Sequence, residues 1–520
     1  MKKKVLKVVA SLACAVLLLG CAFGIYSLVV INGTTTITLD VSKRYQTMEG
    51  FGGSSAWIYQ DLGARGDEDI KDAAMEMLYG DSGLQLNTFR YNVGAGGVEI
   101  DTGYEDSLRA ADSFFVADNF DGDYSVFADE SNYDFATRDQ ATIEMFEKAL
   151  ATGNIKKIIF FANSPHYLMT KSGKTHGAKE RENNLKEECY EAFSQYMLVI
   201  VNYLYQNIVS KYDNDIEILI SPVNEPQWKW GGEGATQEGC HYDPKPLAKF
   251  YDTFYKALKK FNLSHDTDFE MDIFESGDYR MILTSYTKFN EYMTEFAKYD
   301  YFDDVTHISL HSYNVKESVF YREIFADYMA KYYPNISISM SEYCTMEWGN
   351  DLTLIGVDLS IGMGLKCGKV MMRDINMLNV TDWQWWLSIA RGGYEDGLVY
   401  WLEDESGTQS LEVSKRYYVF GHFSKYIKSG SVRISSKYSD FICINGVECC
   451  AFKNPNESIT VVVLNDSKKS HKINLKGLGG YNNVHEVLTD SSVNWQVKDY
   501  KFDGSVTVGA NSIMTFVLTK

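Results

Sequence analysis

A regular alternation of short apolar segments with amphipathic segments runs from Glu49 to about Trp386, and it limits the possible folds more than any other feature. The apolar segments have the length and composition of buried strands. They are Gly50–Trp57, Asn87–Val93, Lys157–Asn163, Glu217–Val223, Phe269–Glu275, Val305–Tyr313, Ile336–Tyr343 and Asn379–Trp386. The segments between them include the amphipathic helices expected at Ala141–Ala151, Glu188–Lys211 and Lys245–Lys260. Eight strands that alternate with helices predict an α/β fold, the (β/α)8 TIM barrel.

The pattern changes after Tyr426, where short β-branched segments are separated by Gly, Asn, Asp and Ser. This pattern predicts an antiparallel β-sandwich as a side domain. Its expected strands are Val432–Ile434, Phe441–Ile444, Cys449–Lys453, Ser458–Leu464, His471–Leu475, Asn483–Leu488 and Ser512–Leu518. A further strand at Thr34–Val41 precedes the barrel, and we expect it to join the sandwich. The predicted domains are therefore residues 32–48 as the first sandwich strand, 49–424 as the barrel and 425–520 as the C-terminal sandwich.

The first 31 residues have the character of an export signal, because a cluster of lysines precedes an uncharged stretch from Val8 to Ile31. Leu18-Leu19-Gly20-Cys21 resembles a bacterial lipobox, which would make Cys21 a lipidated N-terminus. The uncharged stretch of 24 residues also exceeds the ~20 needed to span a bilayer, so an uncleaved anchor stays open. We expect a bacterial protein that is extracellular or on the cell surface, with membrane contact only through residues 1–31.

Composition excludes several classes of partner. The net charge is −20 and no basic stripe is present, so binding to nucleic acid is not expected. The nine Cys have irregular spacing and no CxxC pair, which is typical of buried small apolar residues and not of a zinc site. Gly94-Ala95-Gly96-Gly97 lacks the spacing and the Lys-Ser/Thr of a phosphate-binding loop. We expect no metal, no cofactor and a monomer.

Two glutamates follow apolar strands in the middle of the chain. Glu225 lies near the end of Ile218–Pro226 (ILISPVNEP), and Glu342 lies near the end of Ile336–Tyr343 (ISISMSEY). Barrel enzymes keep their chemistry at the C-terminal mouth of buried parallel strands. Two carboxylates there, on different strands, predict the acid/base and the nucleophile of glycoside hydrolysis. Glu347 is a rival to Glu342, but it lies further into the loop.

The residues beside Glu225 suit a proton donor. Aromatic surroundings raise the pKa of a carboxyl, and Trp228 and Trp230 follow at once. Asn224 can donate a hydrogen bond to a sugar hydroxyl. Taken alone, Asn224-Glu225-Pro226 is better explained by a loop glutamate in an ion pair. If the two carboxyls lie ~5–5.5 Å apart, the reaction retains anomeric configuration through a covalent glycosyl-enzyme.

Further segments are spread from about residue 34 to the end of the chain. They are Glu49–Trp57 (EGFGGSSAW), Phe89–Asn92 (FRYN), Ala162–Pro165 (ANSP), Met169–Gly173 (MTKSG), Pro222–Gln227 (PVNEPQ), Gln237–Cys240 (QEGC), His311–Tyr313 (HSY) and Tyr417–Ser424 (YYVFGHFS). Together they resemble glycoside hydrolase family 30. This resemblance implies that Glu225 is the acid/base at the end of barrel strand four and that Glu342 is the nucleophile at the end of strand seven.

The resemblance also implies which side chains bind the sugar. They are Arg90, Asn224, His311, Tyr313 and Trp383, with Asn163 as a further candidate and Trp57 as a second aromatic platform. Arg90 can instead pin Glu342 or Glu225 through a charge-assisted hydrogen bond. His311 and Tyr313 share one face of a strand, which packing alone also explains. Trp383, Trp385 and Trp386 alternate sides, so some of them must lie in the core.

Three segments most resemble the branch of the family that cleaves β-1,6-galactan. They are Trp228–Trp230, Gln237–Cys240 and Asn163–Pro165. The chain departs from that branch at Pro165-His166-Tyr167, which lacks a second Pro, and at Ile427–Gly430, which lacks a Pro. We expect a retaining endo-β-1,6-galactanase that acts on β-linked oligo- or polysaccharide. The alternatives are a β-1,6-glucanase, a xylanase, a glucosylceramidase-like enzyme or a non-catalytic surface carbohydrate-binding protein.

Overall fold

The structure, a computed structural model, describes residues 35–520 except 101–108, 213–214, 233–234, 236, 347–355, 394 and 439–445. The expected export segment with Cys21, the rival Glu347 and the expected strand Phe441–Ile444 lie outside the described residues. The chain forms two compact units, one of Gln46–Ser429 and one that combines the chain up to Tyr45 with Gly430–Lys520. Within the described part of the chain, no helix is both long and apolar enough to cross a membrane.

The larger unit contains an eight-stranded parallel sheet in the order β6-β5-β4-β3-β2-β9-β8-β7. Its strands are β2 Gly50–Ser54, β3 Thr88–Asn92, β4 Lys157–Phe161, β5 Glu217–Ser221, β6 Glu270–Met271, β7 His307–His311, β8 Ser337–Tyr343 and β9 Asp382–Leu387. The two edge strands meet just beyond the short β6, where Ser309 donates its backbone N–H to Ile273 at 2.7 Å and Ser276 bridges to Leu310. The predicted barrel and all eight of its strands are confirmed.

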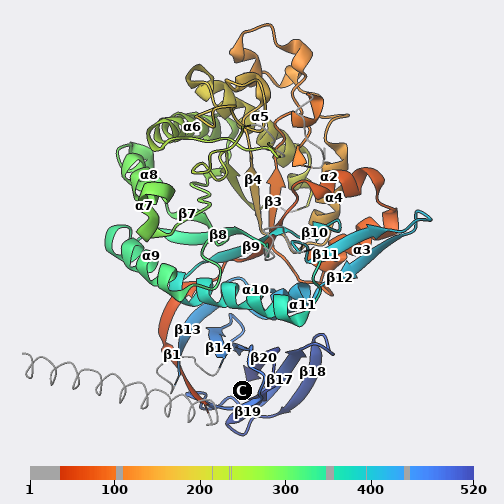
Figure 1. The fold of residues 1–520 in the computed structure, drawn as a ribbon, viewed down its shortest axis with the longest axis vertical. Helices are drawn as coiled ribbons and strands as arrows, with labels where there is room; N and C mark the ends of the chain where they lie inside the picture. The colour runs from red at the N-terminus through yellow and green to blue at the C-terminus, as the bar shows by residue number, and fades with distance from the viewer. Residues whose placement is uncertain are drawn as a thin grey trace, which may run out of the picture. The chain divides into compact units, whose positions relative to one another are not determined.

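Helices surround these strands (Figure 1). They are α2 Ile58–Arg65, α3 Glu68–Tyr79, α4 Gln140–Ala151, α5 Tyr190–Asn207, α6 Pro244–His265, α7 Thr284–Thr287, α8 Phe289–Phe296, α9 Val319–Tyr332, α10 Ile361–Arg373 and α11 Lys415–Ser424. In α6, Pro244 occupies the first turn, where its missing N–H costs nothing. The buried side chains of α6 then recur with helical spacing at Leu247, Phe250, Phe254 and Leu258, so one face of the helix is apolar.

Alternate residues of the barrel strands face the interior and the helix layer. On β9, Trp383 and Trp385 are fully buried and their rings lie 5.7 and 6.4 Å from that of Phe420 on α11. The intervening Gln384 instead donates to Asp382, which also accepts a hydrogen bond from Ser339 of β8 at 2.6 Å. The barrel interior is therefore unusually polar, and polar side chains continue up to the C-terminal ends of the strands.

A small sheet after β9 was not anticipated. It consists of β10 Ile389–Ala390, β11 Val399–Glu403 and β12 Gln409–Val413, with β11 and β12 antiparallel. The strand β11 is apolar and buried at Val399–Trp401, whereas β10 has only two residues and β12 is partly exposed, so the sheet as a whole gives a weak signal.

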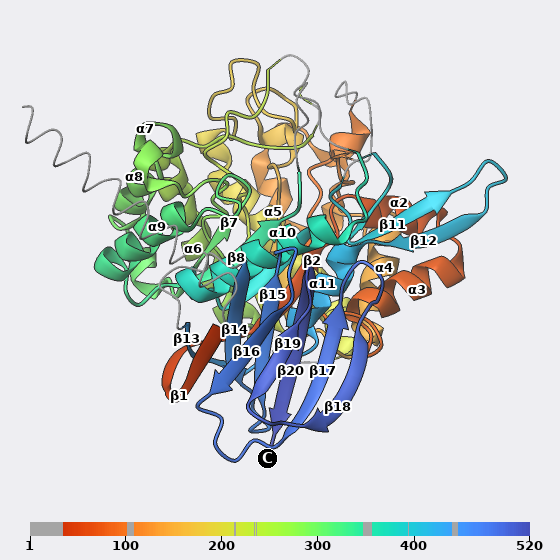
Figure 2. The ribbon, with the colours of Figure 1, turned by 60° about the horizontal axis from the view of Figure 1, so that its bottom comes forward.

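The smaller unit is one nine-stranded sheet in the order β18-β17-β20-β15-β14-β13-β1-β16-β19 (Figure 2). Its strands are β1 Thr35–Thr47, β13 Val432–Tyr438, β14 Val447–Lys453, β15 Ile459–Asn465, β16 His471–Lys476, β17 Asn483–Thr489, β18 Gln496–Lys501, β19 Ser505–Val508 and β20 Ser512–Thr519. All nine contribute to one apolar core, as a sandwich requires. The N-terminal strand joins this unit as predicted, but it runs parallel to β16. The strands β18 and β19 were missed. The strand β18 is polar and largely exposed, and β19 has only four residues.

Candidate active site

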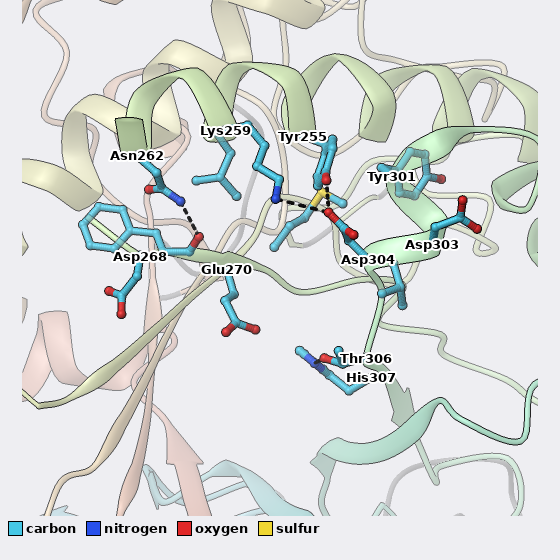
Figure 3. A pocket seen from close by; sticks show the side chains of 14 residues that line it. Tyr255, Lys259, Asn262, Asp268, Glu270, Tyr301, Asp303, Asp304, Thr306 and His307 are labelled. Atoms are coloured by element: carbon cyan, nitrogen blue, oxygen red, sulfur yellow. Dashed lines mark hydrogen bonds and ion pairs between the residues drawn. The ribbon is translucent and has the colours of Figure 1, made fainter. Parts of the chain in front are cut away.

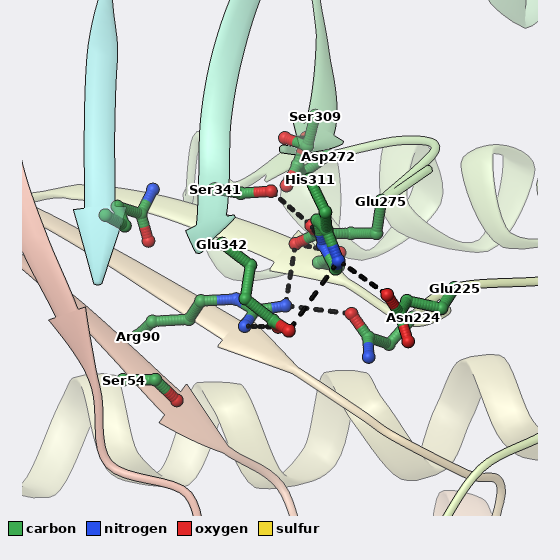
Figure 4. A network of polar contacts seen from close by, with 12 residues as sticks. Ser54, Arg90, Asn224, Glu225, Asp272, Glu275, Ser309, His311, Ser341 and Glu342 are labelled. Atoms are coloured by element: carbon green, nitrogen blue, oxygen red, sulfur yellow. Dashed lines mark hydrogen bonds and ion pairs between the residues drawn. The ribbon is translucent and has the colours of Figure 1, made fainter. Parts of the chain in front are cut away.

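Glu225 and Glu342 meet at the C-terminal ends of the barrel strands (Figure 4). Glu342 lies on β8, and Glu225 lies in the loop after β5 with a positive φ of 45°. That backbone is fixed because the N–H of Glu225 donates to Glu275 O at 3.0 Å and Trp230 Nε1 donates to Glu225 O at 3.1 Å. Both side chains are buried, with 8% of Glu225 and 4% of Glu342 exposed.

The two carboxyl groups are close together. One oxygen of Glu225, one oxygen of Glu342 and one nitrogen of His311 all lie within 4.8 Å of one another. A retaining glycosidase needs carboxyl groups ~5–5.5 Å apart, whereas an inverting enzyme needs ~6.5–9.5 Å to admit a water between them. The spacing therefore fits the retaining geometry.

Arg90 of β3 binds Glu342 and does not line the pocket. Its Nη1 donates to Glu342 Oε2 at 2.6 Å, and its Nη2 donates to Asn224 Oδ1 at 3.0 Å. The guanidinium is fully buried and lies 3.7 Å from the ring centroid of Phe161. The structure thus places Arg90 against the candidate nucleophile, as the alternative role predicted, and not among the residues that line the pocket.

The sequence analysis missed a third carboxylate, Glu275, which is fully buried behind the other two. Glu275 Oε1 accepts from Arg90 Nη2 at 3.1 Å, and its Oε2 lies 2.8 Å from His311 Nε2. His311 Nδ1 lies 3.0 Å from Glu225 Oε1. The signal that found Glu225 and Glu342, a carboxylate at a strand end, was also present for Glu275 in the expected strand Phe269–Glu275.

The charges of this cluster depend on one another. Burial would lower the pKa of His311, but Glu342, Glu225 and Glu275 outweigh burial and raise that pKa to about 10. Burial would raise the pKa of Glu275, but Arg90 and His311 hold it well below its usual range. Burial raises the pKa of Glu342, and His311 and Arg90 oppose this effect. A protonated His311 has no lone pair for a metal ion, so we assign no metal to this cluster.

A pocket of about 570 Å³ opens above the two carboxyls. Its lining includes the predicted residues Asn163, Asn224, Glu225, Tyr313 and Glu342, together with Trp228, Trp230, Gln237, Asn314, Lys316, Tyr343, Cys344, Met346 and Trp386. The hydroxyl of Tyr313 donates to Glu342 Oε1 at 3.0 Å. Asn224 Nδ2 donates to Asn163 Oδ1 at 3.1 Å, which orients the Asn224 amide beside the acid/base candidate.

Three predicted sugar contacts lie elsewhere. Trp383 is fully buried on the helix-facing side of β9, and its Nε1 donates to Asp374 at 2.9 Å. Trp386, which points to the other side, takes its place in the pocket. Trp57 is only 8% exposed and packs edge-on against Trp386 at 5.4 Å, so it supports that ring. His311 is fully buried behind the carboxyls and does not line the pocket.

A second cavity, of about 550 Å³, lies at the opposite ends of the barrel strands (Figure 3). Its lining residues interact with one another: Lys259 pairs with Asp304 at 3.2 Å, and the side chain of Asn262 donates to the backbone carbonyl of Phe269 at 2.9 Å. In barrels the N-terminal face of the strands contributes to stability and not to catalysis. We therefore place the chemistry in the pocket above Glu225 and Glu342.

A TIM barrel with two facing carboxyls in a pocket at its strand ends defines the class of the retaining glycosidases. Residues 34–400 match O-Glycosyl hydrolase family 30, and residues 430–516 match the Glycosyl hydrolase family 30 beta sandwich domain. The chain therefore belongs to glycoside hydrolase family 30.

The chain is also similar to a curated relative and, in its fold, to solved structures. The chain is 24% identical over 408 residues to an endo-beta-1,6-galactanase of Hypocrea rufa, which covers 76% of this chain and 75% of that protein. A conserved exported protein from Bacteroides fragilis has a TM-score of 0.77 at 20% identity, covering 93% of this chain and 100% of that one. The catalytic domain of xylanase C from Talaromyces cellulolyticus has a TM-score of 0.65 at 18% identity, with the same coverage.

Proposed function

We propose that this glycoside hydrolase cleaves β-1,6-linked galactan internally, with Glu342 as the nucleophile and Glu225 as the acid/base. The observation that carries the mechanism is the approach of the two carboxyls to within 4.8 Å. Arg90 and Tyr313 each donate to one oxygen of Glu342, which orients the nucleophile and stabilises its ionised form against the effect of burial.

The reaction proceeds in two displacements. Glu342 attacks the anomeric carbon as the bond to the leaving oxygen breaks, and Glu225 gives its proton to that oxygen. A water molecule then gives a proton to Glu225 and bonds to the anomeric carbon, and the ester bond to Glu342 breaks. Two inversions leave the configuration at the anomeric carbon retained.

The pocket supports a carbohydrate polymer as substrate. Trp228, Trp230, Tyr313 and Trp386 offer aromatic faces to the apolar faces of sugar rings. Asn163, Asn224 and Gln237 offer amides to sugar hydroxyls. Activity on β-1,6-galactan is favoured by the sequence segments shared with that branch and by the galactanase from Hypocrea rufa. β-1,6-Glucan, xylan and glucosylceramide are the competing substrates, and the intact carboxyl pair disfavours a non-catalytic binding protein.

A panel of polysaccharides tests the substrate. The purified protein without residues 1–31 is incubated with β-1,6-galactan, β-1,6-glucan, xylan and glucosylceramide, and the released sugars are separated by chromatography. We expect oligosaccharides of mixed length from β-1,6-galactan and no product from the Glu342→Gln variant. Release of one short product only would indicate exo action, and turnover of another substrate alone would reassign the specificity.

We also propose that the chain is exported and stays attached to the cell surface through residues 1–31, by a lipid on Cys21 or by an uncleaved helix, and that it acts as a monomer. The lysine cluster before the apolar stretch and the lipobox-like segment support this proposal.

A further inference from the structure

We propose that Glu275 is a positioning residue, a permanent anion that keeps His311 an imidazolium whose Nδ1–H serves both catalytic carboxyls in turn. The inference rests on the catalytic roles proposed above for Glu225 and Glu342.

Both nitrogens of the His311 ring face carboxyl oxygens that can accept a hydrogen bond. Nε2 faces Glu275 Oε2 at 2.8 Å, and Nδ1 faces Glu225 Oε1 at 3.0 Å. An ionised carboxylate only accepts hydrogen bonds, and a neutral imidazole carries a single N–H. When the ring carries a proton on each nitrogen, each N–H donates to one of the two facing carboxyl groups. Burial works against this charge, but the facing carboxylates raise the pKa of the ring to about 10.

The hydrogen-bond partners of Glu275 stabilise its carboxylate as an anion. Its Oε1 accepts from Arg90 Nη2 at 3.1 Å and from Ser221 Oγ at 3.3 Å. Its Oε2 accepts from His311 and from the hydroxyl of Ser341. Four donors leave neither oxygen free to carry a proton, and the group is fully buried, so water does not compete for them.

The other two carboxylates near His311 exchange their charge during the reaction. In the free enzyme Glu342 is the anion and Glu225 carries the proton. In the glycosyl-enzyme Glu342 is an ester and Glu225 is the anion. His311 Nδ1 lies 3.0 Å from Glu225 and 3.6 Å from Glu342, so one fixed cation faces the negative charge in both states. A donor that is already in place needs no reorganisation when the charge moves.

The charged groups around the ring come from several elements. They are Glu225 after β5, Glu275 after β6 and Glu342 on β8, and Arg90 of β3 pairs with the last two. Tyr313 lies 6.1 Å from the ring and binds Glu342. Among these groups, only Glu275 keeps the same charge through the cycle and contacts the ring directly.

Nitrogen-15 NMR of the histidine-labelled protein, with both the barrel and the sandwich present, tests the protonation state of His311 without substrate. The His311 signals are assigned by comparison with His311→Gln and followed from about pH 5 to 9, the range in which histidines ordinarily titrate. We expect both ring nitrogens of the wild type to stay protonated over this range. In Glu275→Gln, the ring should lose one proton within this range, because one opposite charge is gone. A wild-type ring with one protonated nitrogen, or a variant with unchanged titration, would overturn the proposal.

Asp272→Asn is the matched control. Asp272 is also fully buried after β6, accepts from Ser309 Oγ at 2.7 Å and faces a histidine, His307, at 3.2 Å, but it has no contact with His311. This variant removes a buried carboxylate of the same barrel, so it reports the effect of structural loss alone. We expect the His311 signals to be unchanged.

The pH profile of kcat/KM supplies the second readout. Glu275→Gln should lower kcat by about 10²–10³-fold and move the alkaline limb of the profile, because the cation that faces both catalytic carboxyls is weakened. Glu275→Asp, which keeps the anion, should retain the wild-type limb. An equal loss in Glu275→Asp and Asp272→Asn with no shift of the limb would show a merely structural role. Because the NMR readout needs no substrate, a wrong substrate assignment and a wrong role for Glu275 are distinguishable.

Discussion

At the residue scale, the site contains side chains that line the open pocket and side chains that are fully buried behind the two carboxyls. Arg90, Glu275 and His311 are fully buried and form hydrogen bonds with one another. Arg90 also binds Glu342, and His311 also binds Glu225. Asn163, Asn224, Tyr313 and Trp386 line the open pocket. Sequence reasoning found most of these positions, because strand ends carry the chemistry of a barrel. It could not separate the two groups, since that depends on depth below the pocket floor.

The tryptophans of β9 make this distinction testable. Trp386→Ala should raise KM about tenfold, or ~1.4 kcal/mol, because it removes an aromatic face from the pocket. Trp383→Phe should leave KM unchanged and lower the free energy of unfolding by about 1–3 kcal/mol, because Asp374 loses the indole N–H. Steady-state kinetics and urea denaturation of both variants check this, and the reverse pattern would return the sugar platform to Trp383.

At the element scale, the register between β8 and β9 determines which tryptophans of β9 face the pocket, a question that the sequence left open. Trp383, Trp385 and Trp386 were expected to alternate, but only the observed pairing of Met340 with Trp383 and of Tyr343 with Trp385 shows which faces β9 turns to the pocket. The break in register between these pairs has no sequence signature. By contrast, the position of β1 was predictable, because its alternating Thr, Ile and Leu pattern matched the sandwich and not the barrel.

The β1 strand gives a stability prediction for the smaller unit. Ile37 is fully buried in the sandwich core, so Ile37→Ala should lower the free energy of unfolding of that unit by about 2–5 kcal/mol. Thr38→Ala, at the adjacent exposed position, is the control and should change it by less than ~0.5 kcal/mol. Equal stability of the two variants in denaturant titrations would contradict the assignment of β1 to this core.

The segment that carries Glu238 gives a prediction for pH. Burial raises the pKa of Glu238 to about 8, so the folded protein binds more protons than the unfolded chain between about pH 4.5 and 8. Stability should therefore fall as pH rises through this window, by up to ~1.4 kcal/mol per pH unit from this group. Glu238→Gln should flatten that slope, and the exposed Glu180→Gln should not. Chemical unfolding at several pH values measures the slopes, and parallel curves for wild type and Glu238→Gln would refute the prediction.

At the scale of the whole molecule, the two architectures were predictable because each carries its own periodicity. Buried strands alternating with helices define the barrel, and short β-branched strands define the sandwich. The strands β12 and β18 were not predictable, because neither has a continuous apolar pattern. Glu275 ends the expected strand Phe269–Glu275, so its position was predictable, whereas the reduction of that strand to Glu270–Met271 was not.

The attachment of the chain to the cell belongs to this scale as well. If Cys21 is lipidated, Cys21→Ser should release the enzyme from the membrane fraction, because the variant has no lipid anchor. If residues 8–31 form an uncleaved helix, the variant should be retained like the wild type. Fractionation of expressing cells distinguishes these results. Wild-type enzyme found wholly in the medium would defeat both forms of attachment.

The measurement that tests the central claim most directly is azide rescue of Glu342→Ala. Removing the nucleophile leaves space in which azide can attack the anomeric carbon once, so a substrate with an activated leaving group should yield a glycosyl azide of inverted configuration. The anomeric coupling in the proton NMR spectrum of the product reads the configuration. Inverted product places the nucleophile at Glu342; a product of retained configuration would contradict the account and move the nucleophile to another residue.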